Sequence, residues 1–155
     1  MRPERSERLN FTLRLATDED FQFAFAAKRD AIGPHVAVRW GWDDAVQLQH
    51  HRRRWQEKPW QIILVSGNPV GTVSIDVQAT HLQFGEFYVT EGFRRQGLGT
   101  AVLLSALSLA DRSHLETRLE YLKWNPVASL YARHGFRVTA ESDTHYFLVR
   151  PPHTP

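Results

Sequence analysis

Apolar and polar residues alternate over 11–15, and this period of two predicts a first β-strand. The period then lengthens, because Phe21, Phe25 and Lys28 follow one another at helical spacing. This spacing predicts a first helix that runs to about Ala31.

Capping and breaking residues set the expected bounds of two helices. Thr17 is suited to cap the first helix, because acidic residues follow it in the first helical turn. Gly33 and Pro34 are expected to end that helix. A second helix is expected to begin after Asp43, its predicted N-cap, and to stop at Pro59.

The rest of the chain alternates between the two periods. Three strands of an antiparallel meander are expected over 61–65, 70–77 and 81–89. An Ala/Leu-rich helix over 97–112 follows, with one face made by Leu98, Ala101, Val102, Ser105 and Leu109. Next come a strand over 115–124, a short helix over 126–134 with proline at its first position, and strands over 136–141 and 145–150. The expected order is β-α-α-β-β-β-α-β-α-β-β.

Length and composition narrow the class of protein. A chain of 155 residues fits one domain over 1–155, with flexible ends expected at 1–10 and 151–155. The absence of cysteine excludes disulfides, thiolate metal sites and a cysteine nucleophile, and it fits a reducing compartment. No run of about 18 apolar residues occurs, and charges occupy the first ten residues, where a signal peptide needs an apolar core. A soluble, cytoplasmic protein is expected.

Charge gives little support for a nucleic-acid or membrane partner. The formal net charge is only +2, and basic residues are scattered among acidic ones, apart from the triplet over 52–54. We interpret this triplet as the solvated face of a helix rather than a binding surface. We therefore expect neither nucleic acid nor membrane as a partner.

The most informative stretch joins a predicted strand to the Ala/Leu-rich helix. Gly97 and Gly99, one residue apart at the helix start, allow a ligand to approach the backbone closely. The N–H groups of a helix start favour an anion, and Arg94 and Arg95 just upstream could add hydrogen bonds to a diphosphate. The stretch therefore predicts a phosphate site, although glycines at such a turn can also be purely structural.

Two other phosphate-binding motifs fit this turn less well. A P-loop needs Gly-Lys-Ser/Thr at its end, whereas Gly99 is followed by Thr100 and Ala101. A dinucleotide fingerprint needs a third glycine where Val102 stands, and it opens a parallel βαβ unit rather than following a meander.

Two motifs resemble those of the GNAT acetyltransferases. Arg-x-x-Gly-x-Gly over 94–99 is similar to the pyrophosphate loop of that family. The segment Asn125 to Phe136, with its Leu-Tyr-x-x-x-Gly-Phe ending, is similar to the family's second signature and follows in the expected order. The resemblance covers roughly 11–150 and is strongest over 84–136.

The resemblance implies a fold, an activity and a donor. The fold class would be α+β, as a three-layer GNAT fold with a mixed central sheet of six to seven strands. About four helices would flank this sheet, and its fourth and fifth strands would splay. The activity would be transfer of an acetyl group from acetyl-CoA to a primary amine of a small molecule or peptide, by direct attack in a ternary complex and without a metal. The alternative is a non-catalytic sensor of the same fold that binds acyl-CoA, and either protein could be a monomer or a homodimer.

The same resemblance assigns roles to residues. Tyr131 would protonate the leaving thiolate, and an N–H near Val89 would polarise the thioester carbonyl. A bulge in the splayed strand would let the backbone of this strand pair with the pantetheine arm. The residues implied to bind acetyl-CoA are Phe87, Tyr88, Val89, Arg94, Arg95, Gln96, Gly97, Leu98, Gly99, Thr100, Asn125, Ser129 and Tyr131.

A carboxylate could remove the proton of the amine, because the pKa of a primary amine is about 10.4. Glu120 lies where some members of the family carry a catalytic glutamate, and Glu86 lies on the splayed strand itself. Strand alternation places Glu86 on the face opposite Phe87 and Val89, but a bulge can rotate it. Both glutamates could instead be solvated, with proton transfer left to water.

Several motif residues also have structural interpretations, and the match has two departures. Gly135 is suited to a left-handed helix end, Phe136 to the core, and Asn125 to a helix cap. The strand lacks the usual proline, since Thr90 and the residue after it stand in its place. The interval from Asn125 to Tyr131 is one residue shorter than in many relatives, which weakens the pantetheine role of Asn125.

In this family the first two helices and their connection usually line the acceptor site. The residues there are Trp40, Trp42 and Asp43, and aromatic rings beside a carboxylate suit a cationic amine. A core or capping role is the alternative for each of them. His50 and His51 are adjacent and point apart on a helix, so no metal site is expected.

Overall fold

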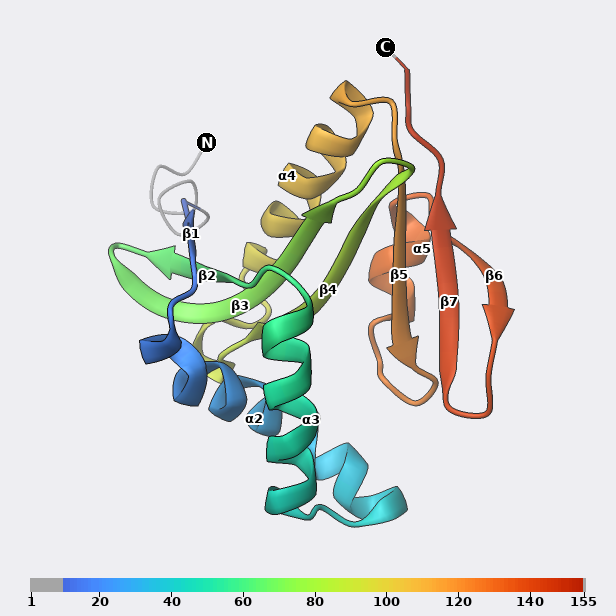
Figure 1. The fold of residues 1–155 in the computed structure, drawn as a ribbon. Helices are drawn as coiled ribbons and strands as arrows, with labels where there is room; N and C mark the ends of the chain where they lie inside the picture. The colour runs from blue at the N-terminus through green and yellow to red at the C-terminus, as the bar shows by residue number, and fades with distance from the viewer. Residues whose placement is uncertain (1–9, 155) are drawn as a thin grey trace. The chain divides into compact units, whose positions relative to one another are not determined.

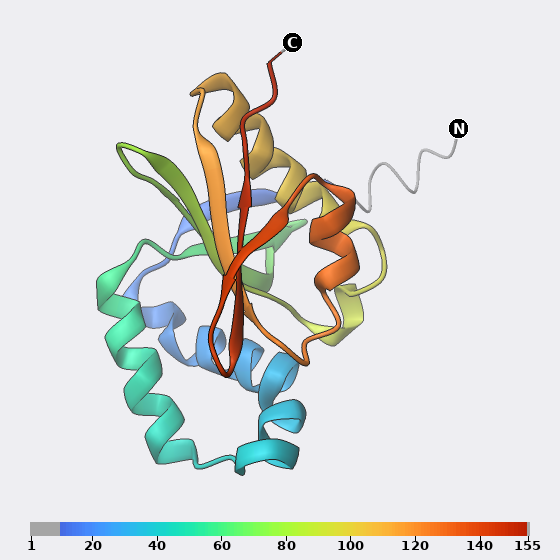
Figure 2. The same ribbon diagram turned by 90° about the vertical axis from the view of Figure 1, so that its right-hand side faces the viewer.

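A computed structural model describes residues 10–154 and contains seven strands and four α-helices (Figures 1 and 2). The strands are β1 Thr12–Leu15, β2 Gln61–Val65, β3 Asn68–Val77, β4 His81–Val89, β5 Glu116–Leu122, β6 Arg137–Glu141 and β7 His145–Arg150. The helices are α2 Phe21–Trp40, α3 Asp44–Glu57, α4 Leu98–Arg112 and α5 Ala128–Arg133, with 3-10 turns η1 Asp18–Asp20 and η2 Glu91–Phe93.

The strands form one mixed sheet in the order β1-β2-β3-β4-β5-β7-β6. β4 and β5 run parallel, and their register joins His81–Gln83 to Glu116–Arg118. The pairs β1–β2, β2–β3, β5–β7 and β6–β7 are antiparallel. The predicted fold class is confirmed, and the short parallel register is consistent with the predicted splay of the fourth and fifth strands.

The described chain divides into two compact units. The first unit contains 10–74 and 86–102, and the second contains 75–85 and 103–154. Of the ends predicted to be flexible, residues 1–9 and 155 lie outside the described chain. Residues 151–154 form no helix or strand, and the backbone N–H of His153 donates to Asp111 Oδ1 over 2.9 Å.

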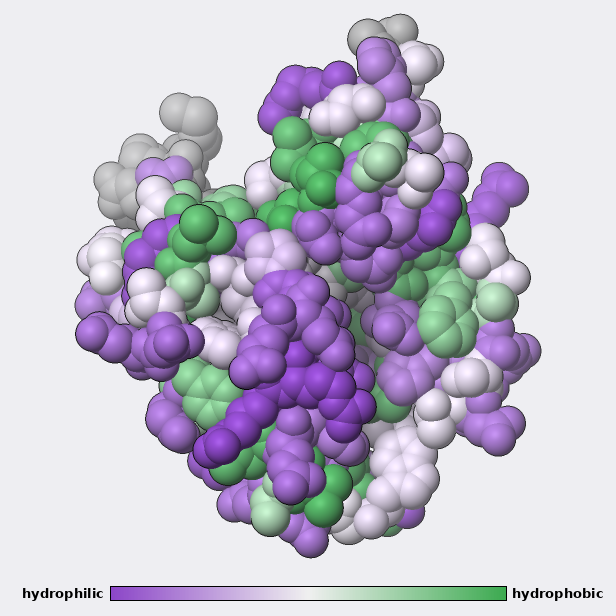
Figure 3. Space-filling view, viewed as in Figure 1, coloured by the Kyte–Doolittle hydropathy of each residue, from purple (hydrophilic) through white to green (hydrophobic). Residues whose placement is uncertain are grey.

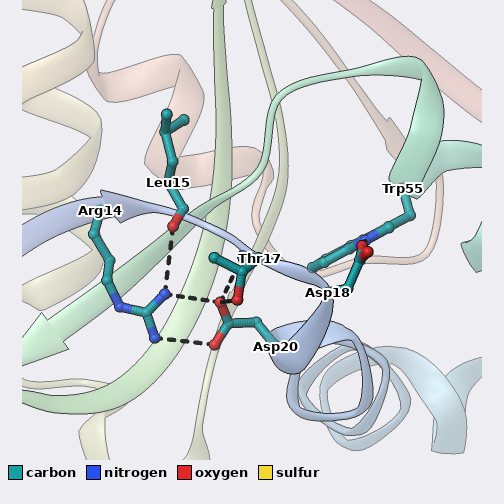
Figure 4. A network of polar contacts seen from close by, with 6 residues as sticks. All are labelled: Arg14, Leu15, Thr17, Asp18, Asp20 and Trp55. Atoms are coloured by element: carbon teal, nitrogen blue, oxygen red, sulfur yellow. Dashed lines mark hydrogen bonds and ion pairs between the residues drawn. The ribbon is translucent and has the colours of Figure 1, made fainter.

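In the first unit, an ion pair connects β1 to the start of the helical segment (Figure 4). The Arg14 guanidinium donates to both carboxylate oxygens of Asp20, over 2.7 and 2.9 Å. The backbone N–H of Thr17 donates to Asp20 Oδ2 over 2.8 Å. Hydrogen bonding to Arg14 lowers the pKa of Asp20 to about 2. Thr17 is therefore an N-cap as predicted, but of the η1 turn that leads into α2.

Helix α2 corrects one prediction, because it continues through Gly33 and Pro34 to Trp40. A proline inside a helix removes one backbone hydrogen bond, so local propensity alone predicts that the helix ends there. Packing outweighs this loss, since Val36 is buried beyond the proline and Gly33 is buried with the Trp42 ring close by. The helix ends where Gly41 takes a φ of 74°.

The other elements of the first unit follow the predicted bounds closely. Asp43 caps α3, because its side chain accepts from the N–H groups of Ala45 and Val46 over 2.9 and 3.2 Å. Ser66 and Gly67 both have positive φ, which is the geometry of a tight two-residue hairpin turn between β2 and β3.

In the second unit, α5 covers one face of the strands β5, β7 and β6 (Figure 2). Leu119, Phe136 and Leu148 are buried there. Arg150 is also buried, and it pairs with Asp111 of α4 over 2.8 Å while donating to the His134 carbonyl over 3.0 Å. This ion pair connects the last strand to α4 and to the end of α5.

Between residues 10 and 154, the structure has no helix that is both long and apolar enough to cross a bilayer.

Candidate active site

The turn from β4 into α4 has the backbone geometry that a phosphate site requires. Arg95 and Gly97 have φ values of 61° and 83°, so the chain reverses sharply just before the helix. The first helical hydrogen bond runs from the N–H of Ala101 to the Gly97 carbonyl. The N–H groups of 98–100 precede that bond, so they have no carbonyl partner within the helix and remain available to an anion at its start.

The two arginines of this turn have different surroundings. Arg94 donates to the Val89 carbonyl over 2.7 Å and to Asp30 of α2 over 3.1 Å, so it holds the turn to its own unit. Arg95 is exposed, and Gln96 donates to the Gly92 carbonyl. Arg95 is therefore the arginine better placed for an added ligand.

Gly99 is not required by the packing of this turn. A Cβ added to it would lie 3.5 Å from the Phe87 ring, which is ordinary van der Waals contact. Gly71 on β3 is the opposite case, because a Cβ there would overlap the Tyr88 carbonyl oxygen. Gly71 is thus needed for the close approach of two strands, whereas Gly99 leaves space over the helix start.

The backbone of β4 is irregular at Glu86, in the strand where the resemblance implied a bulge. Glu86 has a φ of 46°, and its carbonyl accepts from the Thr72 hydroxyl over 2.8 Å. The side chain is 3% exposed, and its Oε2 lies 3.7 Å from Arg54 and 3.6 Å from Lys58. Glu86 is therefore a buried carboxylate among cations.

Glu120, the other candidate base, lies on the surface of β5. It pairs in register with Phe147 of β7, while its neighbour Tyr121 stacks on Tyr131 at 5.9 Å between ring centroids. Because successive strand residues point to opposite faces, Glu120 projects from the face of β5 opposite Tyr121.

The C-terminal end of α5 fixes the position of Tyr131. Gly135 takes a φ of 90°, and the N–H groups of Gly135 and Phe136 donate to the carbonyls of Ala132 and Tyr131. This pair of bonds is a Schellman motif, and the Tyr131 and Phe136 rings make its accompanying apolar contact at 5.6 Å. The predicted roles of Gly135 and Phe136 are confirmed, and the Tyr-x-x-x-Gly-Phe spacing has a local structural cause.

Burial raises the pKa of Tyr131. The residue is only 6% exposed, and burial raises its pKa well above the usual value for tyrosine, with a further contribution from Tyr121. Burial also raises the pKa of Tyr121. Like a tyrosine with its usual pKa of about 10, Tyr131 is protonated at neutral pH, so its hydroxyl has a proton to donate.

The start of α5 differs from the prediction. The helix begins at Ala128 with Val127 at the N-cap, so Pro126 is not its first residue and Asn125 does not cap it. The backbone N–H of Asn125 donates to the Leu122 carbonyl instead, because a turn intervenes between β5 and the helix. Ser129, another residue implied to bind acetyl-CoA, is exposed in the first turn of α5.

The residues predicted to contact the acceptor lie at the connection of α2 and α3. Trp42 donates to Asp44 and contacts Phe25 at 6.4 Å between ring centroids, whereas Trp40 is 55% exposed. Asp43 is used as the cap of α3. An open groove of about 560 Å³ is lined by Ala26, Arg29, Asp30, Gly33, Pro34, Ala37 and Trp42.

Sequence reasoning missed a group of cations in the first unit. Lys28 of α2 is 4% exposed, although lysine is rarely buried. The signal was present, because Lys28 falls on the same helical face as Phe21 and Phe25, but it was interpreted only as periodicity. Arg54 was assigned to a solvated face, yet it lies near the buried Glu86.

His51 is a core residue rather than a metal ligand. Its ring is fully buried, and the rings of Phe21, Phe25, Trp55 and Trp60 surround it with centroids 4.6–5.6 Å away. Burial lowers its pKa, so the imidazole is neutral. Over residues 10–154 no three His, Asp or Glu side chains come close enough to hold a metal ion.

Comparisons with known proteins agree with this geometry. A family model described as the acetyltransferase (GNAT) family matches residues 13–136. Among solved structures, the chain is similar to Ard1 from Thermoplasma volcanium, with 27% identity and a TM-score of 0.62 over 92% of this chain and 98% of that one. It is also similar in fold to PaiA N-acetyltransferase from Thermoplasma acidophilum in complex with coenzyme A, with 14% identity and a TM-score of 0.73 over 92% and 99% of the two chains. The ribosomal-protein-S18-alanine N-acetyltransferase from Escherichia coli gives 16% identity and a TM-score of 0.67 over 94% and 96%.

The matched region contains both the turn into α4 and the helix that holds Tyr131. Since the match spans most of the sequence, the chain belongs to the acetyltransferase (GNAT) family.

Proposed function

We propose that the protein is an acetyl-CoA-dependent N-acetyltransferase that acts on a primary amine of a small molecule or a peptide. The observation that carries the proposal is the start of α4, where positive φ values at Arg95 and Gly97 turn the helix N–H groups toward an anion. Two structures of similar fold, an N-acetyltransferase in complex with coenzyme A and a ribosomal-protein-S18-alanine N-acetyltransferase, support this choice of donor and reaction.

The start of α4 fits a diphosphate in charge and in space. The backbone N–H groups of 98–100 supply donors, and the exposed Arg95 supplies a positive charge. Gly99 has no side chain that could obstruct the phosphate. The fold itself would accept a larger residue there, because an added Cβ would meet only the Phe87 ring. Acetyl-CoA would supply the activated acetyl group, and Phe87 to Val89 would align its pantetheine arm along β4.

The reaction would exchange a thioester for an amide. The amine nitrogen attacks the acetyl carbon, the carbon–sulfur bond breaks, and the Tyr131 hydroxyl gives its proton to the departing thiolate. The Tyr131 hydroxyl holds a proton at neutral pH, as tyrosine does at its usual pKa of about 10, so a proton is available to the departing thiolate. Asn125 and Ser129, near the start of the same helix, are proposed to contact the donor.

Glu86 is the better-supported base of the two carboxylates. Its side chain is 3% exposed and comes from the position of β4 with positive φ, three residues before Val89, whose N–H would polarise the thioester. Glu120 remains the second candidate, but it projects from the surface of β5 on the face opposite Tyr121. A carboxylate in either place would take a proton from the amine directly or through water.

The acceptor would meet the first two helices. Trp40 and Trp42 present aromatic rings at the connection of α2 and α3, and these suit a cationic amine. Asp43 would act there only indirectly, since its carboxylate already caps α3.

A screen of amines tests the proposal. The protein is incubated with acetyl-CoA and a mixture of small primary amines and short peptides with free N-termini, and the products are read by mass spectrometry. The proposal predicts acetylation of at least one amine by the wild type and a large loss of it in Tyr131→Phe. Tight binding of acetyl-CoA with no acetylated amine would favour the sensor of the same fold instead.

A further inference from the structure

The first unit contains a group of three cations, here called the basic cluster: Lys28, Arg54 and Lys58. Lys28 comes from α2, Arg54 from the last turn of α3, and Lys58 from the residue after that helix. All three lie around the carboxylate of Glu86, and the structure provides them with no other carboxylate within ion-pair distance among residues 10–154.

Lys28 is a buried cation, and Glu86 is the one opposing charge that acts on it in the described chain. It is 4% exposed, and its ammonium makes no hydrogen bond or ion pair with any residue from 10 to 154. Burial lowers its pKa to about 8; Arg54 and Lys58 act in the same direction, and Glu86 acts against them. Buried charges in proteins are normally paired, so this ammonium indicates a missing anion.

The carboxylate of Glu86 also lacks a hydrogen bond. Its Oε2 lies 3.6–3.7 Å from Lys58 and Arg54, while its Oε1 is buried and has no hydrogen-bond partner in the described chain. A buried acceptor without a partner indicates a missing N–H donor. One carboxylate also balances only one of the three cations, and the neutral His51 nearby adds no charge.

One kind of ligand would satisfy both unpartnered groups. We propose that the basic cluster binds a carboxylate of the acceptor close to the amine that is acetylated, with that amine donating to Glu86. This inference rests on the proposed function and names its substrate class as amines that bear a carboxylate. A free amino acid or an acidic residue at the start of a peptide would supply this chemistry.

The basic cluster extends from partly exposed side chains to a buried carboxylate. The Arg54 and Lys58 side chains are 45% and 29% exposed, whereas the Glu86 side chain is 3% exposed, so the cluster runs from the surface inward. Figure 3 shows hydrophilic surface over α3, the helix that carries Arg54. A carboxylate entering from this side would meet two cations before it reached Lys28.

Binding in the presence of coenzyme A, which cannot react, tests the inference separately from turnover. The probes are the twenty L-amino acids and their α-amides, with peptides that begin with Asp or with Asn as a second pair. We expect at least one free acid to bind at least about tenfold more tightly than its amide, by calorimetry, because a charge-assisted bond is lost in the amide. The Asp and Asn peptides show whether a side-chain carboxylate serves as well as an α-carboxylate.

Variants assign the effect to the basic cluster. In Lys28→Met the preference for the acid should fall below about twofold, and Arg54→Gln and Lys58→Gln provide the same test at more exposed positions if the buried substitution unfolds the protein. Arg53→Gln removes an equal charge from an exposed position of α3 and should leave the preference unchanged.

Two results would overturn the inference: amides that bind as tightly as acids throughout, or a preference for the acid that survives all three cluster variants. Acetylation of amines without any preference for acids would leave the proposed function in place and reject only this inference. Acid-selective binding without any acetylation would support the carboxylate site and reject the proposed function.

Discussion

Tyr131 shows how local structure fixes one buried side chain, the one proposed as the general acid. The Schellman motif at the end of α5 sets its backbone, and Tyr121 and Phe136 contact its ring. Burial also raises its pKa above the usual value for tyrosine. The position and the pKa of Tyr131 thus arise from the same packing.

Substituting Tyr131→Phe should separate the acid from the ring. Because the phenyl ring keeps the contacts with Tyr121 and Phe136, we expect the melting temperature to change little while kcat falls by about 10²-fold. Since the tyrosine pKa is raised, the wild-type kcat should not decline through tyrosine ionisation as the pH rises to about 10. A variant with wild-type kcat would rule out Tyr131 as the acid.

Two glycines should give opposite results when changed to alanine. Gly99→Ala should leave stability nearly unchanged and weaken coenzyme A binding about tenfold, because the added methyl group meets only Phe87 within the fold but obstructs the phosphate approach. Gly71→Ala should cost about 2 kcal/mol of folding stability, since its Cβ overlaps the Tyr88 carbonyl.

Urea unfolding and calorimetry on both variants make the comparison. If Gly99→Ala bound coenzyme A normally, the phosphate site would have to lie elsewhere than at the start of α4.

At the residue scale, the sequence predicted motif residues better than buried charges. Tyr131 and the glycines of the turn belong to short motifs with fixed spacing, so the sequence alone was enough to identify them. Lys28 and Glu86 owe their environment to elements distant in sequence, since α2, α3 and β4 all contribute. No local pattern contains that information.

At the element scale, the junction of β1 with η1 should be sensitive to acid. The pKa of Asp20 is lowered to about 2, so its ionised form stabilises the fold above the unfolded-state pKa of about 3.9. We expect this contribution to be lost as the pH falls from about 4 toward 2, and Asp20→Asn to lack it at every pH.

The matched control is Glu19→Gln, which removes an exposed neighbouring carboxylate outside the ion pair. Urea unfolding at a series of pH values gives the comparison. An acid-dependent loss of stability in Asp20→Asn as large as in the wild type would show that other carboxylates account for it.

The end of α5 depends on the left-handed conformation of Gly135. Gly135→Ala should lower the free energy of unfolding by about 1 kcal/mol, because an L-residue at a φ of 90° is strained. Thermal unfolding measures the change. Unaltered stability would mean that α5 can end without this motif.

Most elements were predictable because the hydrophobic period changes cleanly along the chain. All seven strands and four helices were expected, and β5 to β7 and α3 lie within a few residues of their predicted bounds. The end of α2 was not predictable, because burial of Val36 and Gly33 outweighs the breaking tendency of Pro34. The prediction of the buried face of α4 was only partly correct, since Leu98 and Val102 are buried while Ser105 is exposed.

At the scale of the whole molecule, strand order was the least accessible feature. The order β5-β7-β6 places the last strand between two earlier ones, and no local pattern dictates this pairing. The mixed sheet and the splay of β4 and β5 were anticipated only through the resemblance to the GNAT family, and the parallel pairing of these two strands was not predicted. Long-range pairing therefore depended on the family, whereas the elements themselves followed from the residues.

The central claim is that the protein moves an acetyl group from acetyl-CoA to an amine. The most direct measurement uses acetyl-CoA labelled with carbon-13 in its acetyl group and quantifies free thiol and labelled amide together. The account predicts equal amounts of both products, dependent on the amine and strongly reduced in Tyr131→Phe. Thiol release no faster than without the protein, for every amine tested, would contradict it.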